Sequence, residues 1–242
     1  MKIFVFTDNH VIYSRLRPAL QSHGPEKLDF FCSEASRKLF EQEIRIGAIT
    51  PITIRGNLET LIDYDIGLSC HSKQIFPAPL VDKVRCVNIH PGFNPYNRGW
   101  YPQAFSLINK LPVGVTIHEM DSEIDHGPII CQERIEIYDW DTSLTIYERL
   151  LDREVAIFIR WLPIILSGEC TAKTPIEEGN YNSKKDFADM CEVDLEKVVT
   201  FKEAIDFLRA MSHPPYFNAF YKSGSDKVWI RLEVKHDGVE SE

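Results

Sequence analysis

Short apolar segments alternate with helix-like segments along the first two thirds of this 242-residue chain. Four to eight consecutive apolar residues make a buried strand, whereas apolar residues spaced three and four apart indicate a helix. Strands that alternate with helices predict an α/β, Rossmann-like fold with a mainly parallel sheet. The expected strands are residues 2–6, 28–32, 65–70, 85–90, 113–120 and 127–137, and the expected helices are 13–23, 37–46, 101–109 and 143–167.

The chain changes character after Gly168, where a polar, irregular segment over residues 170–182 begins. A small C-terminal helix at 201–211 follows, and then two strands at 216–221 and 227–234. The turn Ser223-Gly224-Ser225-Asp226 predicts that these strands form a β-hairpin. We therefore expect a catalytic domain at residues 1–168 and a C-terminal extension at residues 169–242, which is too small to fold alone.

Composition and charge exclude several classes of protein. The formal net charge of −9 comes without a long run of one sign, and no basic stripe of the kind that binds nucleic acid is present. No stretch has the length of a membrane span, and the first apolar run is too short for a signal peptide. The six cysteines form no C-x-x-C pair, which favours buried, reduced thiols and a cytoplasmic location.

Asn88 and His90 flank Ile89 at the end of the strand expected at 85–90. Residues two apart on a strand project to the same side, and ligands of open α/β sheets bind at this edge. An amide can donate a hydrogen bond to a developing oxyanion, and an imidazole can take a proton from an attacking amine. This pair suits acyl transfer, although a polar pair that only closes the strand end is the alternative interpretation.

Asp125 lies in the turn between the last two strands expected in the sheet, two residues before Gly127-Pro128. A carboxylate in this place could reach His90 and fix its tautomer, as a third group does in catalytic triads. A solvated turn is the alternative. The loop from Pro95 to Tyr101 carries an arginine, amides and aromatic rings, which suit an anionic or ring-bearing ligand or, alternatively, an ordinary surface loop.

Other motifs contribute less. Neither a glycine-rich phosphate loop nor a nucleophile elbow occurs in the sequence. His118, inside a strand pattern, is interpreted as a packed histidine.

Three segments in the same order resemble the folate-dependent formyltransferases: Asn88-Ile89-His90, Asn94-Pro95-Tyr96-Asn97-Arg98-Gly99, and Asp125-His126-Gly127-Pro128-Ile129. The resemblance covers residues 1–166. It implies that Asn88, His90 and Asp125 are catalytic, that 10-formyltetrahydrofolate is the co-substrate, and that no metal is needed. It also implies folate contacts at Gln74, Ile75, Phe76, Pro77 and Asp121.

Residues 88–103 and the tail at 212–219 look like the sugar N-formyltransferases within that family. This implies a nucleotide-linked amino sugar as acceptor, namely a dTDP-linked amino-dideoxy sugar such as dTDP-4-amino-4,6-dideoxyglucose, made for bacterial O-antigen. It also implies a homodimer through the C-terminal hairpin. The candidate substrate contacts are Asn9, Lys73, Tyr96, Arg98, Trp100 and Tyr101. The segment Gly92-Phe93-Asn94-Pro95 departs from the family's usual Ser-Leu-Leu-Pro, which bears on the substrate side.

Other functions stay open on the sequence alone. One is formyl transfer to another small amine, such as glycinamide ribonucleotide. Transfer to methionyl-tRNA would need a basic surface and usually a larger second domain, which are missing. A hydrolase could deformylate the folate with water in place of the amine. A catalytically silent binding module belongs to a different class.

Overall fold

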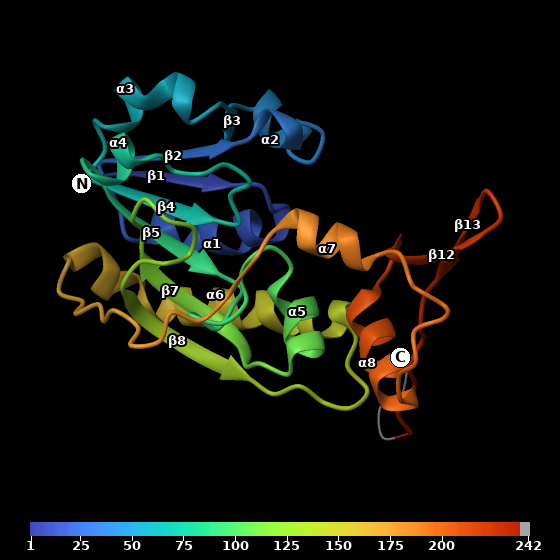
Figure 1. Ribbon diagram of the computed structural model, residues 1–242. Coiled ribbons are helices and arrows are strands. Elements are labelled where there is room, and N and C mark those ends of the chain that lie inside the picture. The colour runs from blue at the N-terminus through green and yellow to red at the C-terminus, as the bar shows by residue number, and fades with distance from the viewer. Residues whose placement is uncertain (238–242) are drawn as a thin grey trace.

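A computed structural model describes residues 1–237, and its centre is a seven-stranded sheet in the order β3-β2-β1-β4-β5-β7-β8 (Figure 1). The first five strands in that order are parallel, and β7 and β8 continue the sheet in antiparallel pairs. The mainly parallel α/β sheet predicted from the sequence is confirmed. The strands are β1 (Lys2–Thr7), β2 (Lys27–Cys32), β3 (Thr50–Pro51), β4 (Ile66–Cys70), β5 (Arg85–His90), β7 (Val113–Glu119) and β8 (Ile129–Ile135).

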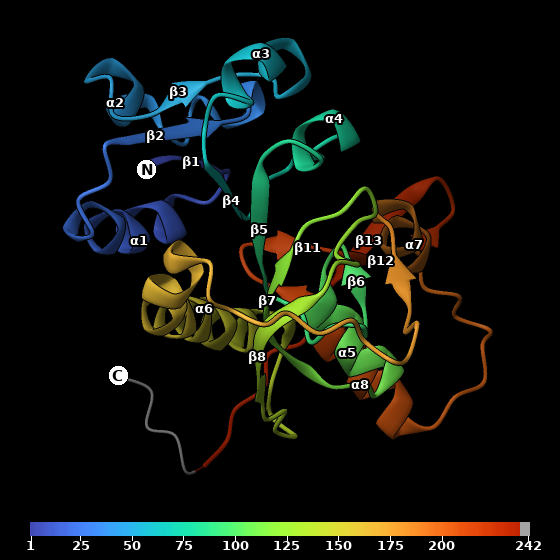
Figure 2. The ribbon, with the colours of Figure 1, turned by 90° about the vertical axis from the view of Figure 1, so that its left-hand side faces the viewer.

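Alternation along β1 shows how both faces of the sheet become buried. Ile3 and Val5 pack into the core on one face, whereas Phe4 and Phe6 pack into the core on the other. The first face is covered by α1 (His10–Ser22), α5 (Pro102–Asn109) and α6 (Ser143–Ser167), and Figure 2 shows α1 and α6 side by side. The second face is covered by short elements that include η2 (Arg55–Asn57), α3 (Leu58–Leu61) and α4 (Ala78–Val81).

The structure departs from the predicted helices in several places. Of the helix expected at 37–46, only the five-residue α2 (Glu41–Arg45) is helical; the buried Phe40 lies in the turn before it, and a 3₁₀ turn, η1 (Glu34–Ser36), comes before that turn. An unpredicted helix, α7 (Lys184–Met190), follows the polar segment. Its signal was the capping box in which Ser183 and Asp186 satisfy each other's backbone N–H groups.

The C-terminal extension begins where α6 ends at Gly168, which adopts the left-handed conformation common after helices. Its hairpin, β12 (Ala219–Ser223) and β13 (Asp226–Ile230), turns at the predicted residues and projects from the body in Figure 1. Before it come α8 (Phe201–Met211) and the small pair β10 (Ser212–His213) and β11 (Tyr216–Phe217). The part of the predicted extension beyond residue 237 lies outside the described residues.

Two further contacts join the extension to the catalytic domain. The short strand β6 (Arg98–Gly99) pairs in parallel with β9 (Tyr181–Asn182). The buried Arg209 of α8 donates from Nε to the carbonyl oxygen of Asp141 at 2.6 Å and from Nη1 to Asp206 at 2.9 Å. A guanidinium that satisfies groups on both parts fixes how they pack.

Neither a helix with the length and apolarity of a membrane span nor a group of three or more potential metal ligands is found within residues 1–237.

Replacing Arg209 with methionine should lower the free energy of unfolding by about 2 kcal/mol, because it leaves the buried backbone carbonyl of Asp141 without its donor and removes one partner of the Asp206 carboxylate, which keeps Lys110. Urea unfolding followed by circular dichroism measures this change. Lys235→Met, at an exposed lysine of the same extension, is the control and should change stability by less than about 0.5 kcal/mol. Equal stability of the two variants would show that Arg209 does not fix the extension.

Candidate active site

The carboxyl end of β5 brings Asn88 and His90 to one edge of the sheet, where both side chains are buried. The antiparallel pairing of β5 with β7 places His118 opposite Asn88 and Thr116 opposite His90. The Thr116 hydroxyl donates to the carbonyl oxygen of Gly92 and accepts from the backbone N–H of Asn94. The loop after His90 is therefore fastened to the neighbouring strand, which holds the end of β5 rigid.

Asp125 meets its predicted partner His90 and also contacts Asn88. Its Oδ1 accepts a hydrogen bond from Asn88 Nδ2 at 2.9 Å, and its Oδ2 lies 3.4 Å from His90 Nδ1. The backbone N–H of Gly99 donates to Oδ2 at 3.0 Å, and Asn94 Nδ2 donates to the backbone carbonyl of Asp125 at 2.8 Å. The structure thus assembles the three residues predicted to be catalytic and braces the carboxylate from the following loop.

The turn that carries Asp125 is held in an unusual backbone conformation. Asp125 has φ +52°, in the left-handed region that aspartate tolerates better than most residues. Two residues later, a Cβ atom at Gly127 would lie 1.9 Å from the carbonyl oxygen of Glu119. Only glycine allows the turn to fold back this tightly on β7, and this close approach carries the carboxylate to His90.

Burial and charge set the protonation of the pair. Burial lowers the pKa of His90 below its usual value, and the nearby Asp125 carboxylate opposes the shift only in part. Burial alone would raise the pKa of Asp125, but His90, His118 and the Gly99 N–H outweigh it and hold the pKa at about 2. At neutral pH a neutral imidazole therefore lies beside an ionised carboxylate. The carboxylate favours the proton on Nδ1, which leaves Nε2 free to act as a base.

His90 Nε2 is buried and makes no hydrogen bond to any described residue. A Cβ atom at Gly92 would lie 2.2 Å from this nitrogen, so the imidazole ring occupies the space that any larger residue would need. Glycine at position 92 therefore lets the ring of His90 turn toward the cavity.

His118 is one of the site residues that the sequence interpretation missed. Its burial as a packed histidine is confirmed, but its imidazole also lines the cavity beside Asn88. Nδ1 donates to the carbonyl oxygen of Glu119 at 2.8 Å, so Nε2 accepts from Asn88 Nδ2 at 3.2 Å. Its place at the site follows from the pairing of β7 with β5, and the spacing of residues in the sequence does not reveal that pairing.

A cavity of about 880 Å³ opens at this edge of the sheet, which is large enough for two substrates side by side. Of the residues expected to contact folate, Gln74, Ile75, Phe76 and Asp121 line the cavity. Pro77 instead caps the short helix α4. The Gln74 amide is held by the backbone of Ile52 and Ile54, so its side chain shapes the loop.

The candidate substrate residues divide into two groups. Asn9, Lys73, Trp100 and Tyr101 line the large cavity. Tyr96 and Arg98 are not among the described residues that line this cavity. The Tyr96 hydroxyl donates to Glu177, and Arg98 lines a separate cavity of about 180 Å³ that Asp125 also lines. The pairing of β6 with β9 turns the arginine to that side, away from the space where a substrate would contact it.

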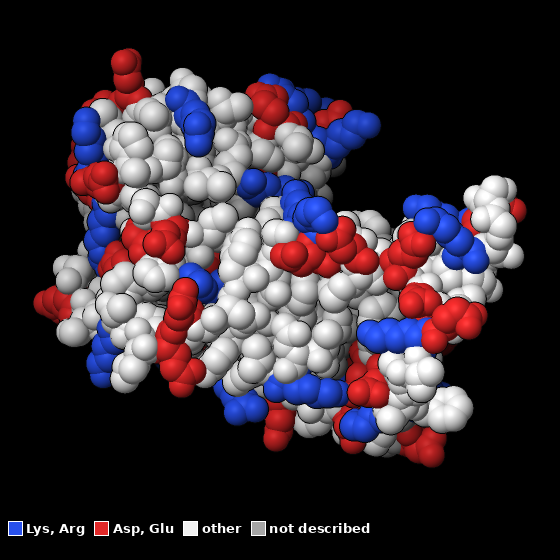
Figure 3. Space-filling model, viewed as in Figure 1, with Lys and Arg blue, Asp and Glu red and all other residues white. Residues whose placement is uncertain are grey.

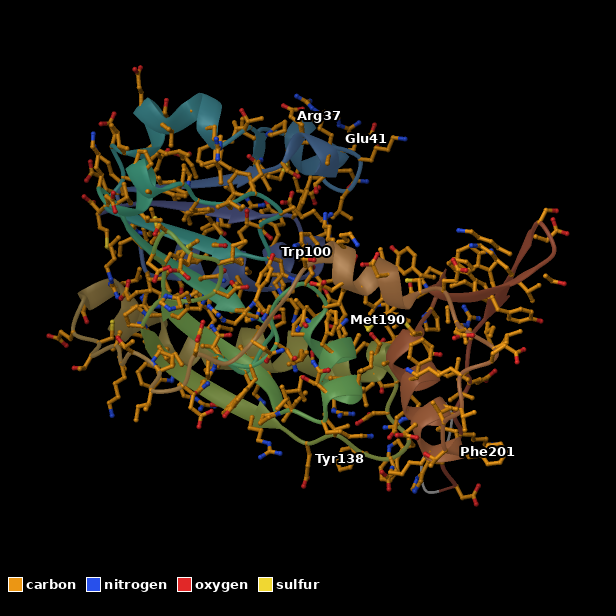
Figure 4. The ribbon with its side chains drawn as sticks, in the orientation of Figure 1. Arg37, Glu41, Trp100, Tyr138, Met190 and Phe201 are labelled. Carbon is orange, nitrogen blue, oxygen red and sulfur yellow. The ribbon has the colours of Figure 1, made fainter. Side chains whose placement is uncertain are left out.

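The C-terminal extension supplies a wall of the cavity, which the sequence left open. The added residues are Tyr181, Phe187, His213, Tyr216 and Asn218. Trp100 lies beside α7 in Figure 4, with the ammonium group of Lys184 3.8 Å from its ring centroid. Tyr101 and Phe187 pack with ring centroids 4.3 Å apart. Aromatic side chains from both parts of the chain therefore close the site.

The outer surface shows no concentration of one charge on the face drawn in Figure 3, where acidic and basic side chains are interspersed. The described part of this face therefore carries no broad field of one sign that would steer a charged ligand.

A neutral imidazole beside a carboxylate, next to an amide and a large cavity, is an arrangement suited to acyl-group chemistry. Two family models match the chain: "Formyl transferase" over residues 65–162 and "N-formyltransferase dimerization C-terminal domain" over residues 186–236. The chain belongs to the formyltransferase family and is an N-formyltransferase.

The relatives include sugar-modifying enzymes. A dTDP-4-amino-4,6-dideoxyglucose formyltransferase of Mycobacterium tuberculosis is 50% identical over 173 residues, which cover 71% of this chain and 74% of the relative. A 4-N formyltransferase from Francisella tularensis is 50% identical, with a TM-score of 0.94 over 97% of this chain and 98% of that one. A sugar N-formyltransferase from a Shewanella species is 36% identical, with a TM-score of 0.91 over 98% of both chains.

Replacing Gly92 with alanine should lower kcat about 100-fold, because the added methyl group displaces the imidazole of His90 from its position as a base. Steady-state kinetics of formyl transfer measure the loss, and circular dichroism checks that the fold is retained. Gly56→Ala is the matched control, since its Cβ would meet only the movable hydroxyl of Thr53. Wild-type kcat in Gly92→Ala would show that the ring is not held as described.

Proposed function

We propose that the enzyme transfers the formyl group of 10-formyltetrahydrofolate to the amine of a dTDP-linked amino-dideoxy sugar, namely dTDP-4-amino-4,6-dideoxyglucose. The observation that carries the acceptor assignment is the 50% identity to the mycobacterial enzyme named for that sugar. The similarity to the 4-N formyltransferase of Francisella tularensis over nearly the whole chain agrees with it. A cavity walled by both parts of the chain has room for the two substrates.

His90 is the proposed proton acceptor. In the reaction, the neutral sugar amine attacks the formyl carbon, a new C–N bond forms, and the carbonyl oxygen gains negative charge. Nε2 of His90, which has no protein partner among the described residues, takes the proton that the amine loses. Asp125 keeps the other ring proton on Nδ1 and stabilises the imidazolium that results. Collapse of the intermediate breaks the bond between the formyl carbon and N10 of the folate, and N10 receives the proton held by His90, which returns the imidazole to its neutral form.

Asn88 is the proposed donor to the oxyanion, together with the protonated His90. Both hydrogens of its Nδ2 are engaged in the structure, one with Asp125 at 2.9 Å and one with His118 at 3.2 Å. The longer contact is to a neutral acceptor and is the weaker of the two. We infer that this hydrogen turns from His118 to the oxyanion as charge develops, while the bond to Asp125 keeps the amide in place.

The two substrates are assigned to opposite ends of the cavity. Phe76 and the neighbouring Met120 belong to the core on the β1 Phe4–Phe6 face, so the folate end lies over that face. The sugar nucleotide is assigned to the end walled by α6 and the extension, where the aromatic rings of Tyr147, His213 and Tyr216 line the cavity. Lys73 is exposed on the loop between the two ends and is the proposed contact for a phosphate group.

A homodimer through the C-terminal hairpin is part of the proposal, as is a cytoplasmic location. The match to a dimerization domain over residues 186–236 supports the dimer. The hairpin carries Trp229 with 48% of its surface exposed, and Phe217 nearby is 50% exposed. Phe201, at the outer end of α8 in Figure 4, adds a further exposed ring. Large exposed rings on a projecting element are typical of a protein interface.

Incubation with 10-formyltetrahydrofolate and dTDP-linked 3-amino and 4-amino sugars tests the reaction, with mass spectrometry to detect the added formyl group. The 4-amino sugar should gain one formyl group. His90→Asn should lower kcat at least about 100-fold, because the base is lost while the polar shape is kept. Formylation of a 3-amino sugar alone would overturn the acceptor position, and release of formate without transfer would favour a hydrolase.

Replacing Trp229 with glutamate should convert the dimer to a monomer, because a charge replaces an apolar ring at the proposed interface. Size-exclusion chromatography with light scattering measures the mass. Ile176→Glu is the control, since Ile176 is fully exposed on a loop outside the hairpin. A Trp229→Glu protein that remains dimeric would move the interface elsewhere.

A further inference from the structure

A chain of four polar side chains lines the α6 end of the cavity and is not used in the proposed chemistry. It runs from Asn9 to Tyr147 on one side and from Asn9 through His71 to Glu154 on the other. Asn9, His71 and Tyr147 all line the cavity, whereas Glu154 is 1% exposed beneath them. Such a chain orients its members, because each hydrogen can point in only one direction.

Asn9 fixes the direction of the chain. Its Oδ1 caps α1 by accepting from the backbone N–H groups of Val11 at 3.0 Å and Ile12 at 3.2 Å. The amide therefore cannot be flipped without leaving the helix uncapped, and Nδ2 must be the atom that faces His71 and Tyr147. Nδ2 donates to the Tyr147 hydroxyl at 3.0 Å and lies 3.4 Å from His71 Nδ1.

His71 has only one tautomer that suits this arrangement. A hydrogen on Nδ1 would point at the amide hydrogens of Asn9, so Nδ1 must be the acceptor. The ring proton is then on Nε2, which donates to the Glu154 carboxylate at 2.7 Å. The backbone of His71 is held with φ +61°, an uncommon conformation for a histidine, at the end of β4. The imidazole thus serves to hold the amide of Asn9.

Tyr147 receives a hydrogen bond but gives none to any residue within 1–237. Because its oxygen already accepts from Asn9, its own hydrogen is directed to the remaining free side, which is the cavity. Burial raises the pKa of Tyr147 to about 12, so the hydroxyl keeps its proton. The hydroxyl is a donor whose direction the protein has already set.

The position of Tyr147 indicates which substrate it meets. It lies on α6, and its ring centroid is 5.4 Å from that of His213 in the C-terminal extension. Both belong to the end of the cavity assigned to the sugar nucleotide, on the opposite face of the sheet from Phe76 and Met120. An acceptor oxygen of the sugar nucleotide, on its diphosphate or on its sugar, is the partner that a fixed hydroxyl donor suits.

We propose that Tyr147 binds an acceptor oxygen of the nucleotide-linked sugar and that Asn9 is a positioning residue that aims its hydroxyl. This rests on the proposed function for the identity of the substrate. It also changes the interpretation of Asn9, whose polar atoms are all engaged within the protein, from a direct contact to an indirect one.

Tyr147→Phe tests the contact, because it removes one oxygen and keeps the ring. KM for the sugar nucleotide should rise about ten-fold, the effect of losing one hydrogen bond to a ligand, while KM for 10-formyltetrahydrofolate stays unchanged. Calorimetry with dTDP alone separates the two sources of the oxygen: weaker dTDP binding assigns the contact to the diphosphate, and unchanged dTDP binding assigns it to the sugar.

Asn9→Asp tests the aiming. Aspartate caps a helix as well as asparagine does, so α1 is retained, but the carboxylate oxygen that replaces Nδ2 accepts the Tyr147 proton and turns it from the cavity. The variant should raise KM for the sugar nucleotide by about the same factor as Tyr147→Phe. The double variant should be no worse than either single one, because both remove the same hydrogen bond.

The outcomes are distinct from those that test the proposed function. Absence of transfer by the wild-type enzyme to any dTDP-sugar would overturn that function. If the wild-type enzyme turns over normally and Tyr147→Phe has an unchanged KM for the sugar nucleotide, only the proposed contact between Tyr147 and the sugar nucleotide is overturned. Additive losses in the double variant would show that Asn9→Asp acts through its charge on the ligand, which would overturn the positioning role of Asn9.

Discussion

The carboxylate of Asp125, whose side chain is only 12% exposed, is the group around which the rest of the site is arranged. A desolvated charge is stable only if every lone pair is met, and here donors arrive from Asn88, from the backbone of Gly99 and from the side of His90. The same contacts fix the tautomer of the imidazole and the orientation of the amide. The requirement to satisfy one charge therefore aligns three catalytic candidates, two from strand β5 and one from the turn between β7 and β8.

The sheet supplies the frame that brings these donors together. Parallel β4 and β5 end at one edge, and β7 returns antiparallel beside β5, so that its side chains meet those of β5 in register. Two tight approaches then aim the groups. Gly127 lets the turn of Asp125 fold back onto β7, and Gly92 leaves room for the ring of His90. The backbone conformation thus positions the functional groups of the site. A site that is preorganised in this way does not need to rearrange during the reaction.

The sequence predicts local features well and long-range ones less well. The spacing of Asn88 and His90 on one strand, the turn at Asp125 and the hairpin turn at 223–226 all depend on near neighbours, and the structure contains each. The position of His118 at the site depends on strand register, and the turning of Arg98 away from the cavity depends on the pairing of β6 with a strand more than 80 residues later. The lining by His213 and Tyr216 requires knowing where the extension packs, which no local pattern encodes.

The same principle applies at both ends of the cavity. At each end, a side chain that the fold holds in place determines which atom of its neighbour carries a proton or where that proton points. At the His90 end, Asp125 holds the proton on Nδ1 and leaves Nε2 as a base. At the α6 end, the cap of α1 holds the Asn9 amide, which in turn leaves the Tyr147 hydroxyl as a donor. One end therefore offers a proton acceptor and the other a proton donor, although an acidic side chain lies beside a histidine at each, Asp125 beside His90 and Glu154 beside His71. A cavity arranged in this way can orient the sugar nucleotide through the Tyr147 hydroxyl and leaves Nε2 of His90 as the base that takes the proton of the attacking amine.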